Sequence, residues 1–284
     1  MSDRRQKNVE IFEDTRRFYN EEPFLRESIQ SSIAATALYT GENERTLPDE
    51  TCGGQVRVTK HRTFEAAVKL HEEFPDKRIT VLNFASATNP GGGVTRGASA
   101  QEESLCRCST LYPVISTKEL RKSFYEPNRQ KNNLHEDTCI YTPDIVICKT
   151  DEDTPHRLDR ERFITVDVIS CAAPNLREKP SNIYNAEGGD VVSITPENLY
   201  KLHLKRAKHI MHTAAFNKAE ILVLGAFGCG AFRNDPKIVA RAYGDALNEF
   251  QNRFDVIEFA IYCRESETAN YDEFRKAMTR YLKT

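Results

Sequence analysis

The sequence predicts an α/β protein whose mixed, largely parallel sheet is covered by helices. From about residue 55 onward, apolar segments of strand length alternate with segments of helical periodicity. Residues 163–173 (FITVDVISCAA) are almost continuously apolar and β-branched, which is typical of a strand buried on both faces. Two glycine-rich loops, 89–93 and 225–230, directly follow apolar segments. In open α/β sheets, ligands bind beyond the carboxyl ends of strands, where such loops meet.

The first 54 residues differ from the rest, because they contain helical patterns without a strongly apolar strand. Phe12 and Tyr19 mark a first helix, and a second helix begins after Pro23 and runs towards Leu38. Residues 41–54 are polar and contain Gly and Pro, which indicates a loop. We therefore expect an N-terminal helical extension, residues 1–54, packed on a main domain of residues 55–284.

The main domain is expected to contain six strands and six helices. Pro143 interrupts one strand segment, which predicts an edge strand or a bulge there. Residues 151–162 are the most charged stretch and predict an exposed loop, while residues 130–137 and 174–191 predict irregular connections. The expected strands are 56–58, 79–84, 140–149, 163–173, 221–224 and 256–262, and the expected helices are 63–74, 100–112, 119–125, 196–217, 236–250 and 270–282.

Composition excludes several classes of protein. The chain has 284 residues, a net charge of −2 and 39% hydrophobic residues, so a general basic field for nucleic acid is absent. We expect no direct DNA binding. No apolar run is long enough for a membrane helix, and the charged N-terminus predicts no signal peptide. The eight scattered cysteines predict reduced thiols and a cytoplasmic protein, or a nuclear one if the source is eukaryotic.

The segment 81–112 (VLNFASATNPGGGVTRGASAQEESLCRCSTLY) combines a glycine triplet with paired carboxylates. The triplet, Gly91–Gly93, is as compatible with a simple turn as with a ligand-binding loop. It matches neither a P-loop nor the dinucleotide-binding fingerprint. Alone, Glu102 and Glu103 fit a solvated helix N-terminus. After the glycine loop, one Glu can face a ligand while the other braces it, and burial beside a second carboxylate can raise the pKa of an acid.

The second glycine-rich loop is Gly225–Phe232, whose small residues allow the backbone to approach a diphosphate. Phe227 or Phe232 could stack on a ribose or base, and we expect Phe227 to belong to the core instead. Cys229 has no basic partner nearby in sequence and is assigned to packing. The seven histidines lack the spacing of a zinc site, so no metal is expected, and His203 is expected to pack near the apolar side of its helix.

Two further segments are combined with the segment 81–112. They are 167–175 (DVISCAAPN) and 224–236 (LGAFGCGAFRNDP), and the second of them contains the second glycine-rich loop. Together they resemble the bacterial-type poly(ADP-ribose) glycohydrolases, a branch of the macrodomain superfamily. The family signature is a glycine triplet, a short spacer and Gln-Glu-Glu, which here is Gly91–Gly93, seven residues and Gln101-Glu102-Glu103. The resemblance implies a three-layer α/β/α macrodomain-like fold, with residues 55–284 as the catalytic domain.

The resemblance also implies roles for individual residues. Glu103 would protonate the leaving ribose oxygen and then, as a carboxylate, activate water, so the usual separation between two catalytic carboxyl groups would not apply. Glu102 would hydrogen-bond the substrate riboses, and Asn89 would orient the distal ribose. The implied substrate-binding residues are Asn89, Gly91, Gly92, Gly93, Gln101, Pro174, Asn175, Gly228, Cys229, Gly230, Ala231 and Phe232, of which 228–231 would hold the diphosphate and Phe232 would lie against the ribose.

The implied reaction is hydrolysis of the ribose–ribose O-glycosidic bonds of poly(ADP-ribose), mainly from the free end, with ADP-ribose as product. The substrate would be the polymer or ADP-ribosylated proteins, the enzyme would need no cofactor, and the chain is expected to be a monomer. Two alternatives stay open: a non-catalytic ADP-ribose-binding macrodomain and a hydrolase acting on mono-ADP-ribosylated proteins. A structural α/β domain without a ligand is a third.

Overall fold

A seven-stranded mixed sheet forms the centre of the computed structural model, which describes residues 3–41, 46–47, 51–129, 132–180 and 190–282. The predicted loop positions 42–45, 48–50, 130–131 and 181–189 lie outside the described residues. Among the described residues, no helix is both long and apolar enough to span a bilayer. The strand order is β1-β4-β5-β3-β6-β7-β2. The strands are β1 (Ala37–Tyr39), β2 (Gln55–Thr59), β3 (Ile79–Phe84), β4 (Cys139–Ile147), β5 (Ile164–Cys171), β6 (Ile221–Leu224) and β7 (Val256–Ala260).

The five strands from β5 to β2 in the sheet order run parallel, and β4 and β1 add two antiparallel pairings at one side. In the centre, Val81 of β3 pairs with Val168 of β5 and Val223 of β6. Because parallel strands end at the same edge of the sheet, the loops that follow β3 and β6 meet there. The prediction of a mixed, largely parallel sheet is confirmed.

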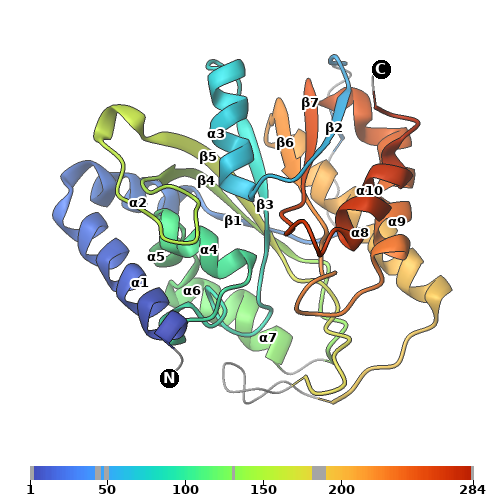
Figure 1. Cartoon of the computed structure of the whole chain (residues 1–284), viewed down its shortest axis with the longest axis horizontal. Coiled ribbons are helices and arrows are strands. Elements are labelled where there is room, and N and C mark those ends of the chain that lie inside the picture. The colour runs from blue at the N-terminus through green and yellow to red at the C-terminus, as the bar shows by residue number, and fades with distance from the viewer. Residues whose placement is uncertain (1–2, 42–45, 48–50, 130–131, 181–189, 283–284) are drawn as a thin grey trace.

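Helices cover both faces of this sheet, as Figure 1 shows. Neighbouring residues of β3 point to opposite faces, so that Val81 belongs to one hydrophobic cluster and Leu82 to the other. Helices α1 to α5 supply the first cluster, and α8 to α10 supply the second. The helices are α1 (Asp3–Glu21), α2 (Pro23–Ala35), α3 (Thr63–Glu73), α4 (Gln101–Cys108), α5 (Leu111–Ile115), α6 (Lys118–Leu120), α7 (Glu126–Arg129), α8 (Pro196–Phe216), α9 (Pro236–Phe250) and α10 (Ala269–Met278).

The N-terminal segment is more than a helical addition, because it also contributes a strand. Helix α2 ends at Ala35, and Thr36 has an extended backbone. Residues 37–39 then pair antiparallel with β4, with Leu38 opposite Ile140. The prediction that the second helix runs towards Leu38 is therefore wrong at its end, since pairing with a distant strand determines the conformation of this segment. The division at residue 54 stays a prediction.

The expected helix 100–112 is two helices, α4 and α5. Helix α4 ends at Cys108, where Ser109 forms an isolated bridge with Ile147 and the Thr110 N–H bonds to Val146 O. Pairing with β4 thus interrupts the helix. Beyond α5, the expected helix 119–125 is part of a longer helical run, in which a π-helical segment, η2 (Arg121–Tyr125), links α6 to α7.

The strand that contains Pro143 does have a bulge, as predicted. The register of β4 against β5 shifts between Thr142 and Ile145, although β4 is not an edge strand. Asp144 in the bulge has a φ of 55°, and its carbonyl accepts hydrogen bonds from the Ser28 and Ser32 hydroxyls. The bulge therefore anchors α2 to the sheet.

The charged segment 151–162 is largely exposed, but Asp151 is an exception to that prediction. Its carboxylate accepts hydrogen bonds from the Phe64 N–H, at the start of α3, and from the Ser104 hydroxyl on α4. Asp151 is half-buried, and burial raises the pKa of its carboxyl group. Asp151 thereby links the two helices that flank β3.

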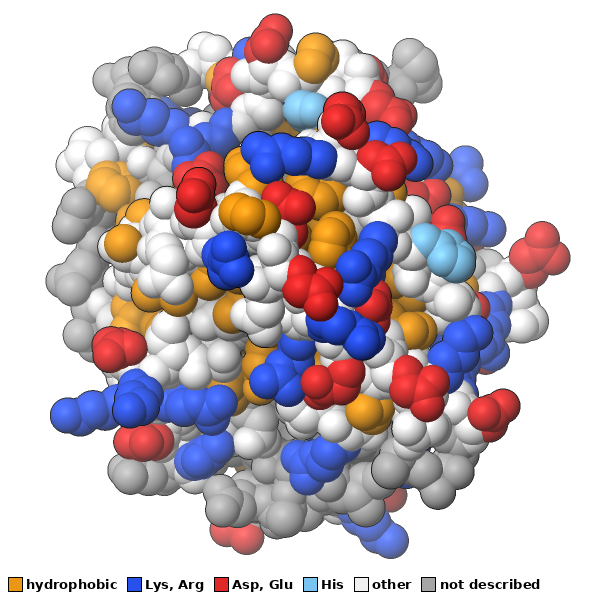
Figure 2. All heavy atoms as spheres, turned by 90° about the vertical axis from the view of Figure 1, so that its left-hand side faces the viewer, with side chains coloured by type: hydrophobic (Ala, Val, Ile, Leu, Met, Phe, Trp, Pro, Cys, Tyr) orange, Lys and Arg blue, Asp and Glu red, His pale blue; other side chains and the backbone are white. Residues whose placement is uncertain are grey.

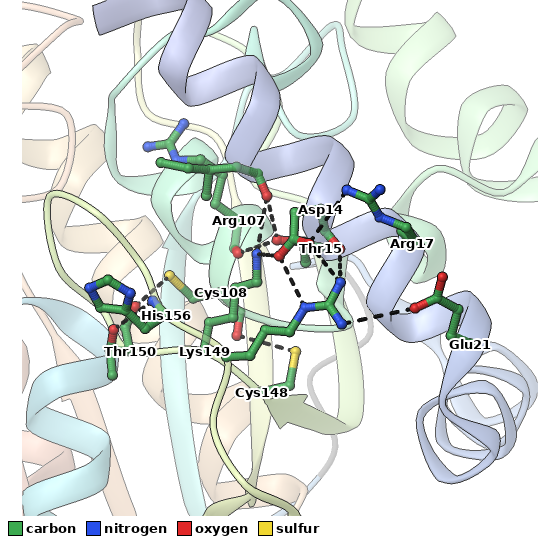
Figure 3. A network of polar contacts seen from close by, with 12 residues as sticks. Asp14, Thr15, Arg17, Glu21, Arg107, Cys108, Cys148, Lys149, Thr150 and His156 are labelled. Carbon is green, nitrogen blue, oxygen red and sulfur yellow. Dashed lines mark hydrogen bonds and ion pairs between the residues drawn. The ribbon is translucent and has the colours of Figure 1, made fainter.

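A polar network joins α1 to the end of β4 (Figure 3). The Lys149 ammonium, which is 1% exposed, lies 2.7 Å from Asp14 Oδ2 and donates to Ile11 O. Arg157 binds the other oxygen of Asp14 at 2.6 Å. The Arg157 hydrogen bond is the largest cause that lowers the pKa of Asp14 to about 2. A buried ammonium therefore depends on one carboxylate from α1.

Replacing Asp14 with asparagine is expected to lower the free energy of unfolding by about 3 kcal/mol, because the buried Lys149 loses its counter-ion. Urea denaturation at neutral pH measures the change. Glu13→Gln is the matched control, since it removes only an exposed ion pair with Arg16 and should change stability by less than about 1 kcal/mol. An equal loss of unfolding free energy in both variants would contradict a special role for the buried Lys149–Asp14 ion pair.

Candidate active site

A cavity of about 1070 Å³ lies beyond the carboxyl ends of β3 and β6. Both glycine-rich loops and the start of α4 contribute to its wall. Gly91, Pro174 and Cys229 are not among the lining residues, whereas the other predicted site residues are. Those that line it are Asn89, Gly92, Gly93, Gln101, Glu102, Glu103, Asn175, Gly228, Gly230, Ala231 and Phe232.

The glycine triplet forms a turn that presses the backbone against the carboxylate pair. Gly91 and Gly92 have φ values of 67° and 57°, which favour glycine. A Cβ added to Gly92 would lie 2.5 Å from Glu103 Oε1 and 3.2 Å from Glu102 Oε2. The turn and the ligand-loop interpretations of the triplet are thus compatible, since the turn brings the chain next to both acids.

Glu103 is 7% exposed, and its side chain reaches the cavity from the first turn of α4. Its Oε1 accepts a hydrogen bond of 2.8 Å from the Gly93 N–H. Burial raises the pKa of Glu103, while the Gly93 N–H and the Arg107 charge act in the opposite direction. A buried carboxyl group with a raised pKa is suited to donate a proton near neutral pH.

Glu102 is braced by the segment that follows β3. Its Oε2 accepts a hydrogen bond of 2.7 Å from the Ser86 N–H, and the Asn83 amide donates to its Oε1 at 3.3 Å. Burial, followed by the neighbouring charge of Glu103, raises the pKa of Glu102 to about 8. The two adjacent glutamates therefore differ in their hydrogen-bond partners, and the solvated-face interpretation of the pair is wrong, because both are buried.

Gln101 precedes the two acids and attaches α4 to neighbouring elements. Its Oε1 accepts from the Phe84 N–H, and its Nε2 donates to Leu82 O and to the Thr63 hydroxyl. These bonds cross-link α4 to the end of β3 and to the start of α3. Its predicted role in substrate binding stays a prediction, and the contacts indicate that it positions the helix.

Asn89 is the first residue of the first glycine-rich loop. Its Oδ1 accepts a hydrogen bond from Arg129 of α7, which also donates to Thr88 O. Sequence analysis missed Arg129, because it lies 40 residues further along the chain in a segment without a motif.

The second glycine-rich loop is held by a buried polar relay. Gly228 has a φ of 77°, and its carbonyl accepts from the Asn234 amide, which also donates to Pro174 O. His203 of α8 bonds Asn234 Oδ1 at 2.8 Å. His203 is fully buried, as expected, but its polar partner and Asn234 itself were not foreseen.

The two phenylalanines of this loop occupy different environments. Phe227 is fully buried in the core, as predicted, and Phe232 is half-buried in the cavity wall. Asn175 also reaches the wall, where its Oδ1 accepts from Arg177 Nε at 3.1 Å. Pro174 contacts the site only indirectly, through its carbonyl and Asn234.

Sequence analysis also missed Asn83 and Ser86, which hold Glu102. A signal existed for Asn83, because it is a fully buried polar residue in a strand whose other residues, apart from Thr80, are apolar. Such residues are hydrogen-bonded as a rule. Ser86 acts through its backbone N–H toward Glu102, so its side-chain type carried no signal for this contact.

The single sheet between two layers of helices, the two glycine-rich loops and the buried carboxylate pair define this chain as a macrodomain-like protein with an acid–base pair in its cavity. A family model described as microbial-type PARG, catalytic domain, matches residues 6–150. This match covers more than half of the chain, and the chain belongs to that family. The resemblance inferred from the motifs is thus confirmed.

Solved structures of this family are similar over nearly the whole chain. The poly(ADP-ribose) glycohydrolase of Thermomonospora curvata bound to the inhibitor ADP-HPD is 28% identical, with a TM-score of 0.78 over 95% of this chain and 99% of that chain. The Deinococcus radiodurans enzyme in complex with ADP-ribose is 30% identical, with a TM-score of 0.73 over 89% of this chain and 98% of that chain. Comparison with curated proteins gave no match.

Proposed function

We propose that this protein is a poly(ADP-ribose) glycohydrolase that cleaves ribose–ribose O-glycosidic bonds and releases ADP-ribose. One observation carries the proposal: two adjacent, buried glutamates with raised pKa values meet a glycine-rich turn in a large cavity. Family membership and the similar enzymes support the same activity. A protein that only binds ADP-ribose has no need of a buried acid pair.

Glu103 is proposed as the catalytic acid and base. Its protonated carboxyl group donates the proton to the leaving ribose oxygen as the bond from that oxygen to the anomeric carbon breaks. The resulting carboxylate then removes a proton from water, whose oxygen forms the new bond to the anomeric carbon. The Gly93 N–H at 2.8 Å stabilises the carboxylate between these steps.

Glu102 and Asn89 are proposed to fix the ribose next to Glu103. The Ser86 N–H holds one oxygen of Glu102, and Arg129 holds the carboxamide oxygen of Asn89. Side chains held in this way reach a bound sugar with little loss of conformational freedom, which favours a reactive geometry. A single glutamate serving both proton transfers is consistent with this division of roles.

The diphosphate is proposed to lie against the loop from Gly228 to Ala231, with Phe232 against the ribose. An added Cβ at Gly230 would meet no atom within 4 Å, so this part of the backbone is open to a ligand. At Gly228, by contrast, the Ala173 and Asn234 side chains are close, and the relay through Asn234 holds the loop in shape. Cys229 contributes its backbone rather than its thiol.

The experiment supplies purified poly(ADP-ribose) and a mono-ADP-ribosylated protein side by side and follows free ADP-ribose. Release from the polymer, with loss of single terminal units, is the expected result. Release only from the modified protein would replace the proposal with a mono-ADP-ribosyl hydrolase. Stabilisation by ADP-ribose without any release would leave a binding module, and no stabilisation at millimolar ADP-ribose would indicate a domain without this ligand.

The pH dependence of cleavage follows from the raised pKa values. Burial raises the pKa of Glu103 above its ordinary value, so its acid form persists to a higher pH than in an exposed glutamate and is lost as the pH rises through the raised pKa. Single-turnover cleavage should therefore slow on the alkaline side, because the acid form of Glu103 disappears as the pH rises. ADP-ribose affinity measured over the same range is the control. A rate that rises steadily up to about pH 10 would contradict the acid role.

We also propose that the protein acts as a monomer on the polymer or on ADP-ribosylated proteins in the cytoplasm, without direct contact to DNA. Figure 2 shows that Lys and Arg side chains are mixed with Asp and Glu over the face of α1 and α2. Ion pairs such as Arg16–Glu13 and Arg160–Glu22 belong to these helices and their surroundings. A mixed-sign face is a poor match for a nucleic-acid backbone.

A further inference from the structure

The buried stripe of α1 contains two polar residues, Asn8 and Thr15, which alternate with the aromatic residues Phe12 and Tyr19. Both polar side chains bond to backbone carbonyls near the proposed catalytic acid. Asn8 Nδ2 donates to Gly97 O at 3.1 Å, and Thr15 Oγ1 donates to Arg107 O at 2.6 Å. Helix α1 therefore contacts the catalytic segment at both of its ends, the loop before α4 and the last turn of α4.

Arg107 completes a hydrogen-bonded circuit that returns to the proposed acid. Its guanidinium donates to Ala98 O at 2.7 Å, and the Ala98 N–H donates to Gly93 O at 3.1 Å. The Gly93 N–H in turn donates to Glu103 Oε1 at 2.8 Å. Arg107 lies one helical turn after Glu103 on α4, so this circuit closes within 15 residues of chain, from Gly93 to Arg107.

The side chain of Arg107 is 5% exposed, which is unusual for an arginine. Burial lowers its pKa, and the nearby Glu103, Asp151 and buried cysteines act against that change. Keeping a guanidinium at this depth costs free energy unless its hydrogen bonds and charge are used. Figure 3 shows Arg107 next to Thr15 of α1, which bonds the arginine's own carbonyl.

The loop from Gly93 to Ala98, which is part of this circuit, also contacts α1. Gly97 has a φ of 76°, and a Cβ at this position would overlap the carbonyl of Arg5 on α1. The loop thus has α1 on one side and Arg107 on the other. The position of the Gly93 N–H, and with it the orientation of the Glu103 carboxylate, depends on these contacts.

We propose that Arg107 is a positioning residue for catalysis, which orients Glu103 through Ala98 and Gly93 and is itself held by Thr15 of α1. This inference rests on the proposed function, since it concerns the geometry of the same acid. It extends that function to a residue that the family motif does not assign and to a helix outside the glycine-loop signature. A purely structural role would affect stability alone, whereas positioning changes turnover more than affinity.

The first test compares Arg107→Met, which removes charge and donors, with Arg107→Lys, which keeps a charge and a donor. Arg107→Met should lower kcat for polymer hydrolysis about 100-fold, while the Kd for ADP-ribose changes less than about threefold. Arg107→Lys should recover at least about tenfold of this loss. Unchanged kcat in folded Arg107→Met, or equal losses in kcat and affinity, would overturn the proposal.

The second test leaves the cavity untouched and keeps the inference falsifiable if Arg107→Met does not fold. Thr15 does not line the cavity, and Thr15→Val removes its hydroxyl at nearly constant volume, while Thr15→Ser keeps the hydroxyl. Thr15→Val should lower kcat about fivefold with unchanged ADP-ribose affinity, and Thr15→Ser should match the wild type. Equal kcat in all three proteins would reject the role of α1.

These experiments distinguish a failure of the proposed function from a failure of the positioning role of Arg107. If wild-type protein releases no ADP-ribose from the polymer, the proposed function fails before any variant is compared. If the wild type is active and Glu103→Gln is inactive, but Arg107→Met and Thr15→Val keep full kcat, only the positioning role is wrong.

Discussion

The Glu103→Gln variant is expected to lose hydrolysis of poly(ADP-ribose) by at least about 1,000-fold, because glutamine can neither donate nor accept the transferred proton. Glutamine has nearly the same shape and can still contact the Gly93 N–H through its carboxamide oxygen. ADP-ribose affinity should therefore stay within about threefold of the wild-type value. Free ADP-ribose released from purified polymer measures the first quantity, and isothermal titration calorimetry measures the second.

The same Glu→Gln change at Glu72 is the matched control, since this residue is exposed on α3 and does not line the cavity. Its activity should equal that of the wild type. ADP-ribose release by Glu103→Gln at the wild-type rate would show that another group supplies the proton, and Glu102 would then be the next candidate.

Replacing Gly92 with alanine is expected to reduce hydrolysis at least about 100-fold, because the new methyl group competes for space with both acids. An ideal Cβ lies 2.5 Å from Glu103 Oε1 and 3.2 Å from Glu102 Oε2, and the φ of 57° is also unfavourable for alanine. Either the turn or the carboxylates must move. Steady-state kinetics and thermal unfolding separate a displaced acid from a loss of fold.

Gly244→Ala in the middle of α9 is the control for this substitution. An added Cβ there makes only ordinary contacts, the nearest at 3.7 Å, and the backbone is helical. Activity should be unchanged, and stability should rise by about 0.5–1 kcal/mol because alanine favours the helix. Full activity of Gly92→Ala would mean that the turn does not need to approach the acids this closely.

The main elements of the sheet could be predicted because each has a strong local signal. The strands at Ile79–Phe84 and Ile221–Leu224 are short apolar runs, and each is followed by glycine-rich sequence. The predicted helix ends that were wrong lie in segments whose conformation depends on partners far away in sequence. Leu38 becomes extended because it pairs with Ile140, and the helix breaks at Ser109 because of Ile147. Local propensity contains no information on such pairings.

The residues of the candidate site also fall into those with a local sequence signal and those without one. Glu102 and Glu103 stand out because two acids follow a glycine triplet, and the family resemblance then suggests their roles. The groups that hold the site in place carry no such signal: Arg129 lies in a segment without a motif, and Asn234, although it lies within the segment 224–236, is an ordinary polar residue to which the resemblance gives no role. They acquire their function only when the fold brings them to Asn89 and Pro174. The roles of all these residues stay predictions until the variants are measured.

The contacts of α1 have a consequence for how the chain reaches its folded state during synthesis. The bonds from Asn8 and Thr15 span 89 and 92 residues of sequence, and those to Lys149 and Arg157 span about 140. Helix α1 is therefore translated before these partners, and its partner surface is complete only after Arg157 has been translated. At roughly 5–20 residues per second, translating the residues between Asp14 and Arg157 takes about 7–30 s. Its aromatic side chains Phe12 and Tyr19 are then candidates for chaperone binding.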